Sequence, residues 1–491
     1  MSESAPNAQL ILTRADAAYR TTLGAQFVRA LCKVAGVAVL ARLVSPAEHG
    51  LFAMASSVVF LLVQFRDIGA GTAAIQAREL TEEQKSTLFR LHVVGGVALM
   101  LFTIALAWPA ARFFQEPRVA PLLCVMGASF ILLGLNAWPR TLLTRHLHYS
   151  EINRIETIAA VLGTASMIGA AAVGAGAYSF VVFLLVSEAT LVGAWMHCRW
   201  RPVAPARWES VREILRLGMQ LTRANLIVAA TQQVDAVLLG RWFGPAALGF
   251  YNRAGQILQQ PTLHLATPFS QVLLATLSRL GPGSDDFSRQ LRETANLIAY
   301  LTLPLAAVAF GAPEQVVHLV LGSGWPEAAP MLRWLAVGAA ATYLGATATP
   351  VAIAANHARR LVYLNGALLL LLLLGFVIAR PLGPVGLAAA YALVNAGLLL
   401  PRLACSVRGT PVHIKDYGNA FSGPLTLAVA ISLGAWLGPF AMSDQPMPTQ
   451  IVVAFSSAAI AGALCIAGIA RVRREIARIW ARRRSAAVPP P

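Results

Sequence analysis

The residues best able to do chemistry in this sequence are two bases, Arg29 and Lys33, inside an apolar stretch. They are one helical turn apart, so on a helix they share a face. A charge near the middle of a membrane helix costs roughly 2.5–3.5 kcal/mol, so something must offset it. An acid on another helix would make a structural ion pair, whereas an anionic ligand in a water-filled cavity would make a binding site. We favour the ligand, because ionisable residues inside membrane spans commonly serve function.

Other charged residues also fall inside the apolar stretches, and bases outnumber acids there. The excess is three positive charges, so mutual pairing cannot neutralise all of them. A positive interior favours a ligand that carries phosphate or carboxylate. The set consists of Arg29, Lys33, Arg66, Arg223, Arg253 and Arg333 against Asp67, Glu188 and Asp235.

The three acids of this set, Asp235, Asp67 and Glu188, have two possible roles. Each can bind a coupling proton or sodium ion, or it can pair with a buried arginine; for Asp235 we favour pairing. Asp67 directly follows Arg66, and neighbouring residues of a helix do not face each other, so each needs its own partner. We expect Arg66 to be a further contact for the anionic ligand.

Membrane-spanning helices must position these residues. The chain has 491 residues, of which 57% are hydrophobic and 12% charged, with a mean hydropathy of +0.63; a soluble chain carries about 25% charged residues. Apolar runs of about 20 residues recur throughout, so the sequence predicts an all-α polytopic membrane protein with about fourteen spans. We place the spans at 20–43, 49–73, 89–110, 119–138, 153–173, 177–197, 216–240, 247–275, 291–312, 328–355, 360–379, 384–404, 418–438 and 449–470.

The sequence holds no motif that would recommend an enzyme. It has no glycine-rich phosphate loop, no HExxH and no suggestive Ser/His/Asp spacing, and no loop is long enough to form a soluble catalytic domain. The five cysteines are scattered without metal-ligand spacing. We therefore expect a membrane transporter with no catalytic residue, no metal and no cofactor.

The net charge of +17 sets the topology and does not mark a nucleic-acid-binding protein. When the N-terminus is placed in the cytoplasm, most Lys and Arg residues fall in cytoplasmic segments, as the positive-inside rule requires. Both termini are then cytoplasmic. The bases in the opposite loops are Arg42, Arg112, Arg118, Arg241 and Arg380.

A repeat divides the chain. The segment ARLVSPAEHGLFAMA at 41–55 aligns with GRWFGPAALGFYNRA at 240–254 in an R-x-x-x-P-A-x-x-G register. The predicted spans between the copies give both the same orientation, as in transporters built from parallel repeats; chance similarity of turn chemistry is the alternative. The predicted domains are an N-terminal lobe at 1–197, a cytoplasmic interfacial linker at 198–213, a C-terminal lobe at 214–404, two extra spans at 405–470 and a basic amphipathic cytoplasmic tail at 471–491. We expect the apolar face of that tail to lie on anionic lipid.

Four segments resemble those of a known family. The stretch DAVLLGRWFGPAALGFYNRAGQILQQPTLHLATPFSQVLLATLSRL, from Asp235 to Leu280, resembles the signature of Wzx-type polysaccharide and lipid-linked oligosaccharide flippases. These belong to the multidrug/oligosaccharidyl-lipid/polysaccharide exporter superfamily. Further family segments are resembled by LARLVSPAEHGLFAMA at 40–55, RDIGAGTAAIQ at 66–76 and PRTLLTRHLHY at 139–149. The most similar subgroup is the colanic-acid-type exopolysaccharide exporters.

The resemblance implies a fold and a function. It implies two six-helix lobes around a central cationic cavity, whose basic residues map onto Arg29, Lys33 and Arg253. The implied substrate is an undecaprenyl-pyrophosphate-linked oligosaccharide repeat unit, moved across the bacterial inner membrane by alternating access for exopolysaccharide, lipopolysaccharide or O-antigen biosynthesis. Membrane lipids, a polysaccharide polymerase and export proteins are the other implied partners, with no nucleic acid.

Three other functions remain open at this point. A multidrug exporter of the same superfamily ranks second, because organic cations favour acidic or aromatic walls and this interior is net positive. A polyprenyl-linked glycosyltransferase or polymerase would need a large external loop or an acidic pair. A membrane scaffold would leave Arg29 and Lys33 without a purpose.

Overall fold

A computed structural model shows an all-helical chain. The residues that it describes contain α-helices and short 3-10 helices and no strand, which confirms the predicted all-α class. These residues are 8–66, 80–145, 148–195, 200–204, 206, 209–261, 265–282, 284–410 and 412–476.

Ten of the described helical segments are long and apolar enough to cross a membrane, and Tyr178–Gly193 is a shorter apolar helix. The polytopic class is therefore confirmed, while the expected total of about fourteen spans stays a prediction. The ten segments do not include α9 (Glu209–Pro261) or α10 (Thr267–Leu280), which correspond to the predicted spans seven and eight. Polar residues interrupt the apolar face of α9, and α10 is short.

The chain separates into two compact units, Met1–Gly249 and Phe250–Pro491. The predicted lobes, divided by a linker at 198–213, remain a prediction. Since α9 runs from the first unit into the second, its residues are assigned to one unit or the other by number.

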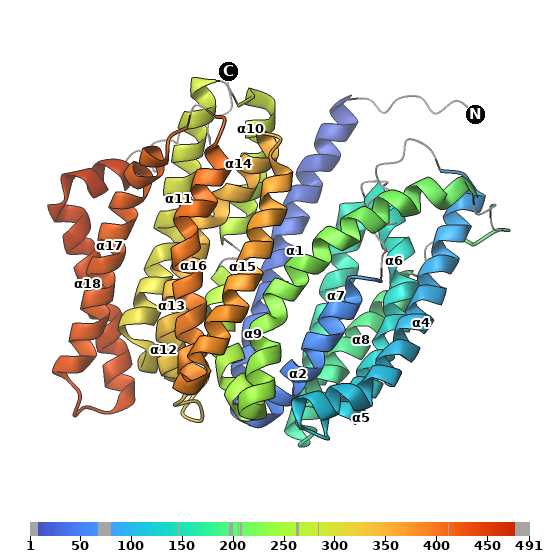
Figure 1. The fold of residues 1–491 in the computed structure, drawn as a ribbon, viewed down its shortest axis with the longest axis horizontal. Coiled ribbons are helices and arrows are strands. Elements are labelled where there is room, and N and C mark those ends of the chain that lie inside the picture. Colours follow the sequence, from blue (N-terminus) through green and yellow to red (C-terminus); the bar gives the residue numbers. More distant parts are fainter. Residues whose placement is uncertain are drawn as a thin grey trace. The chain divides into compact units, whose positions relative to one another are not determined.

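The first unit is a helical bundle in which α7 packs against α1 and α8, and α4 packs against α5 and α6 (Figure 1). Its helices are α1 (Ala8–Leu43), α2 (Pro46–Val63), α4 (Glu82–Phe114), α5 (Val119–Gly127), α6 (Ser129–Arg145), α7 (Tyr149–Ala172), α8 (Tyr178–Trp195) and the first part of α9.

Local sequence signals set the start of two of these helices. At α4, the Gln84 amide donates to the Thr81 hydroxyl at 3.2 Å, and the Thr81 amide donates to the Gln84 side chain at 3.0 Å. This reciprocal capping satisfies amides that have no partner inside the helix. At α2, the Ser45 hydroxyl accepts from the Glu48 amide at 3.4 Å, and Pro46 occupies the first turn, where no backbone donor is needed.

Within the first unit, the two copies of the sequence repeat approach each other closely around Gly50 and Gly249. A Cβ atom added to Gly50 would collide with the carbonyl oxygen of Pro245, and one added to Gly249 would collide with that of Pro46. The chain kinks just before this contact, at Gly244, whose φ of 81° favours glycine. The shared glycine of the P-A-x-x-G register thus has a physical purpose, since it lets the two backbones approach each other.

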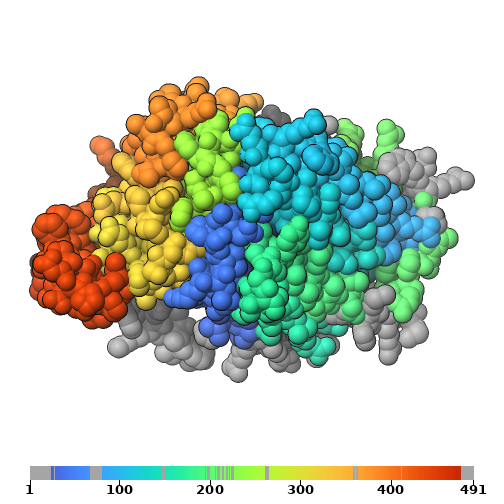
Figure 2. Space-filling model, turned by 90° about the horizontal axis from the view of Figure 1, so that it is seen from below, coloured from blue at the N-terminus to red at the C-terminus, as the bar shows by residue number. Residues whose placement is uncertain are grey.

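The second unit is a separate bundle in which α11 packs against α13 and α17, while α16 packs against α13 and α15. Its last two spans, α17 and α18, pack on each other, and Figure 2 shows them in red beside the yellow α11–α13 region. The elements after α10 are α11 (Asp285–Gly311), α12 (Pro313–Val320), α13 (Ala328–Leu344), η2 (Gly345–Thr347), α14 (Ala348–Ala354), α15 (Ala358–Ala379), η3 (Arg380–Leu382), α16 (Gly383–Val407), α17 (Ile414–Ala441) and α18 (Met447–Gly468).

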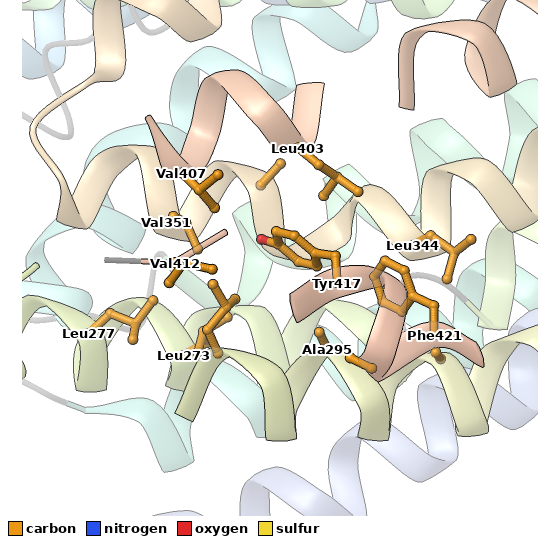
Figure 3. Packing of buried hydrophobic residues seen from close by; sticks show 14 of the residues in the cluster. Leu273, Leu277, Ala295, Leu344, Val351, Leu403, Val407, Val412, Tyr417 and Phe421 are labelled. Carbon is orange, nitrogen blue, oxygen red and sulfur yellow. The ribbon is translucent and has the colours of Figure 1, made fainter. Parts of the chain in front are cut away.

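An apolar cluster holds α10, α14, α16 and α17 together near Tyr417 (Figure 3). The Tyr417 ring lies 5.5 Å from the Phe421 ring, and its hydroxyl accepts a hydrogen bond from Thr347 at 3.4 Å. Close packing of this kind, rather than exclusion of water, stabilises helix contacts within a bilayer.

The described part of the predicted tail packs on the protein. Val472 is fully buried and Ile476 is half-buried, in a cluster with residues of α17 and α18. The Glu475 carboxylate accepts from the Tyr300 hydroxyl at 2.8 Å and from the Asn296 amide at 3.3 Å. Up to residue 476, the apolar face of this segment therefore contacts helices, and residues 477–491 lie outside the described part.

Candidate functional site

Arg29 is held against α7 by three contacts. Its guanidinium donates to the Asn153 side-chain oxygen at 3.2 Å and to the Asn153 carbonyl at 3.4 Å. It also lies 3.5 Å from the Glu156 carboxylate. Because α1 packs on α7, the backbone positions this arginine beside the first two turns of α7. The partner acid considered in the sequence analysis thus exists, and it is Glu156.

Glu156 does not belong to Arg29 alone. Its other carboxylate oxygen lies 2.9 Å from the Arg140 guanidinium, which α6 presents. Two guanidiniums therefore share one carboxylate, and the group of Arg29, Arg140, Asn153 and Glu156, which we call the Glu156 cluster, keeps an excess of one positive charge. The Arg140 side chain is 60% exposed, against 24% for Arg29, so one side of the cluster is open to a ligand.

Lys33 adds a second positive charge next to this cluster. It lies one turn after Arg29 on α1, and its side chain is exposed. Among the residues that the structure describes, Lys33 makes no hydrogen bond and no ion pair. Gln26 of the same predicted polar stripe is also exposed, whereas Gly36 is buried against Met167 of α7. The polar face of α1 therefore ends at Lys33.

Glu188 and Arg66 lie in the same electrostatic neighbourhood. The Glu188 carboxylate, on α8, accepts a hydrogen bond from the Asn136 amide of α6 at 2.6 Å. Arg66, Arg140 and Glu156 all lie close enough to act electrostatically on Glu188. This places Arg66 and Glu188 near the Glu156 cluster; Asp67 lies outside the described residues.

The other predicted residues lie elsewhere. Asp235 is half-buried on α9, where its carboxylate accepts from the Ala236 amide at 2.8 Å. Arg253 belongs to the second unit, is only 7% exposed and donates to the Gln256 side chain at 2.7 Å. Arg333 is exposed on α13, and the Arg223 side chain is not described. The structure therefore groups Arg29, Lys33, Arg66 and Glu188 in one unit.

Sequence reasoning missed four members of this neighbourhood: Asn136, Arg140, Asn153 and Glu156. All four lie at or near the ends of predicted apolar spans, where polar residues are expected and attract no attention. A signal was nevertheless present. Asn136 and Arg140 are four residues apart, and Asn153 and Glu156 are three apart, so each pair shares a helix face. What the sequence could not provide was the packing of α1 on α7.

A second charged group, the Glu48 cluster, consists of Glu48, Glu116 and Arg118. The Arg118 guanidinium lies 2.8 Å from Glu48 and 2.9 Å from Glu116, and Glu48 also accepts from the Ala177 amide at 2.9 Å. The hydrogen bond from Arg118 holds the pKa of the Glu116 carboxyl below its usual range, and the same bond raises the pKa of Arg118. This cluster ties the start of α2 to the connections that follow α4 and α7.

No metal site is evident in the described parts of the chain, where no three His, Cys, Asp or Glu residues are grouped. Cys32, Cys124 and Cys405 are half-buried free thiols, and Cys465 is a buried one. The guanidiniums and amides near Arg29 are hydrogen-bond donors that can bind anionic oxygens and orient them.

Residues 39–330, more than half of the chain, match the model of a family described as "Polysaccharide biosynthesis protein". The chain belongs to this family. The matched region includes the whole Glu156 cluster except Arg29.

Two curated relatives are also named as biosynthesis proteins. The chain is 24% identical over 406 residues to the teichuronic acid biosynthesis protein TuaB of Bacillus subtilis (strain 168). This match covers 81% of this chain and 83% of TuaB. It is 23% identical over 302 residues to the lipopolysaccharide biosynthesis protein WzxC of Escherichia coli (strain K12). The second match covers 61% of each protein, so it spans less than two thirds of WzxC.

Two solved structures share the fold. The lipid II flippase MurJ, in an inward closed conformation, matches with a TM-score of 0.72 at 13% identity over 91% of this chain and 99% of that one. An inward-facing multidrug resistance MATE family transporter matches with a TM-score of 0.62 at 15% identity over 77% and 93%. Likeness at such identities is evidence for the fold alone. The chain is therefore a multi-pass helical membrane protein of a polysaccharide biosynthesis family.

Proposed function

We propose that this protein is a flippase for a lipid-linked oligosaccharide with an anionic headgroup. The substrate would be an undecaprenyl-pyrophosphate-linked repeat unit, carried from the cytoplasmic to the periplasmic leaflet of a bacterial inner membrane. Membership in a polysaccharide biosynthesis family and the fold shared with a lipid II flippase support a transporter, not an enzyme. Both termini would then be cytoplasmic.

The observation that carries the proposal is the uncompensated positive charge on α1. Lys33 lies near the middle of the span Gly24–Leu43, with its ammonium exposed and without a described partner, beside two guanidiniums that share one carboxylate. Charge at that depth is costly unless water or a ligand compensates it. A pyrophosphate offers several anionic oxygens, and guanidiniums bind such oxygens in a fixed, often bidentate geometry.

The proposed mechanism is alternating access. The pyrophosphate and sugars enter a cationic cavity from the cytoplasmic side while the polyprenyl tail stays in lipid, and a rearrangement of the repeated halves then opens the cavity to the other side. Arg29 and Lys33 would bind the phosphates, with Arg66 and Arg253 as further contacts. Asp235, Asp67 and Glu188 would couple an ion gradient or pair with these bases.

A multidrug exporter is the alternative that the fold itself allows, since a MATE family transporter shares it. Organic cations require acidic or aromatic walls to offset their charge. Lys33 and the Glu156 cluster together carry excess positive charge, which would repel an organic cation. The sign of this site therefore favours an anionic substrate.

The test is polymer export in cells that depend on the protein. Arg29→Ala and Lys33→Ala should each abolish export while the amount of protein in the membrane stays unchanged. Arg42→Ala is the matched control on the same helix, because Arg42 is exposed and its guanidinium donates to the Ala38 carbonyl of its own helix at 2.7 Å. Wild-type polymer output from both site variants would exclude the proposed cationic site.

A further inference from the structure

We propose that Glu156 is an internal substitute for the substrate's phosphate: it occupies the anion site when the site is empty and is displaced by the headgroup. The proposal rests on the proposed function. It assigns to Glu156 a part in selecting ligands by charge.

The geometry of Glu156 is that of a bridging anion. One carboxylate oxygen faces Arg29 on α1 at 3.5 Å, and the other faces Arg140 on α6 at 2.9 Å. A phosphate oxygen pair would meet the same two guanidiniums in the same way. Without Glu156, these two cations from different helices would face each other and repel. A resident carboxylate therefore keeps the empty site assembled.

The contact with Arg29 is the weaker of the two, which makes displacement feasible. At 3.5 Å it is longer than the Arg140 contact, and Arg29 keeps its bonds to Asn153 when Glu156 leaves. Glu156 itself is partly exposed, at 24%, so water can solvate the carboxylate once it is released. Arg29 would thus stay in place for an incoming ligand.

The charge balance decides which ligand can compete. Glu156 brings one negative charge to two guanidiniums, and Lys33 lies one turn away with an exposed ammonium. A pyrophosphate group carries more negative charge than a carboxylate and can engage all three bases. A neutral or singly charged headgroup gains little by replacing Glu156. The site should therefore select a pyrophosphate over a monoanion.

The experiment measures inorganic pyrophosphate binding to the purified full-length protein in lipid nanodiscs. Glu156→Gln removes the competing charge, so its dissociation constant should fall about fivefold, the factor that corresponds to roughly 1 kcal/mol for a partly exposed ion pair. Glu151→Gln is the matched control, an exposed acid on the same helix, and should bind like the wild type. If Glu156→Gln does not fold, Glu156→Asp, which keeps the charge but shortens the side chain by one methylene, should give a smaller gain.

The outcomes separate the two proposals. Pyrophosphate binding that Arg29→Ala weakens but that Glu156→Gln leaves unchanged or weakens would overturn the role of Glu156 and keep the anion site. Absence of binding in every variant would overturn the proposed function as well. Farnesyl pyrophosphate in a parallel titration distinguishes a lipid headgroup from a free anion. A gain for inorganic pyrophosphate alone would contradict a lipid substrate.

Discussion

The first unit contains two charged clusters that use the same chemistry for different ends. In the Glu48 cluster, the Arg118 guanidinium contacts the carboxylates of both Glu48 and Glu116, and the Ala177 amide donates to the second oxygen of Glu48. In the Glu156 cluster, two guanidiniums share one carboxylate, with the exposed Lys33 alongside. The first cluster therefore keeps an excess of one negative charge, whereas the second keeps an excess of one positive charge, which an anionic ligand can offset.

Their places along the helices differ as well. Glu48 lies in the first turn of the segment Pro46–Val63, Glu116 and Arg118 lie in the connection between two apolar segments, and Ala177 follows the end of α7. Glu156 and Arg29 lie inside segments apolar enough to span a membrane. An ion pair near water contributes little and costs little, while a charge inside a span is costly. Excess charge is therefore an indication of function at the Glu156 cluster and not at the Glu48 cluster.

The largest expected effect comes from replacing one base at each cluster: Lys33, beside the Glu156 cluster, and Arg118, within the Glu48 cluster. Lys33→Glu should reduce transport by at least about 100-fold, since it repels the headgroup and adds a second acid beside Glu156; a loss of this size corresponds to about 2.7 kcal/mol. Arg118→Gln should leave transport within about twofold of wild type and lower only thermal stability. Export and melting temperature, measured on both variants, would show whether the two clusters differ in this way. Equal loss of transport in both would remove the distinction.

The next effect concerns the close approach of the two repeat copies beside the Glu48 cluster. Gly50→Ala places a methyl group where the Pro245 carbonyl lies, and backbone cannot yield cheaply, so we expect loss of folded protein or destabilisation of about 3 kcal/mol. Gly95→Ala is the control, because no heavy atom lies within 4 Å of the added carbon. Folded yield in detergent measures both variants. If Gly50→Ala resembled Gly95→Ala, α2 and α9 would not approach so closely.

Much of the fold was open to prediction because lipid imposes it. A bilayer requires long apolar helices, so composition and run length alone identify a polytopic all-α protein. Helices α9 and α10 are harder to classify, because polar residues such as Gln232 and Asp235 interrupt one and the other is short. The repeat could be aligned from its R-x-x-x-P-A-x-x-G register, but only the structure shows that Gly50 and Gly249 approach each other.

The candidate site was predictable only in part. Arg29 and Lys33 stand out in sequence because charge is rare within apolar runs. Glu156 and Arg140 do not stand out, since polar residues near span ends are ordinary, and their importance comes from helix packing between distant parts of the chain. Arg253 and Arg29 look alike in sequence, yet one is nearly buried beside an amide and the other is bound to a carboxylate.

The smallest expected effect is the pH dependence of the Glu48 cluster. Because Arg118 lowers the pKa of Glu116 in the folded protein, the stabilisation is complete above the unfolded pKa of about 4.3 and is lost as pH falls through the lower folded value. Arg118 stays charged throughout this range. Wild type should therefore lose slightly more thermal stability than Arg118→Gln between pH 6 and pH 3.5, by no more than about 2 °C, since exposed ion pairs contribute ~1 kcal/mol or less. If the melting temperatures of the two proteins fell equally with pH, Arg118 would not stabilise the Glu116 carboxylate. The Glu48 cluster would then not contribute to stability through this ion pair.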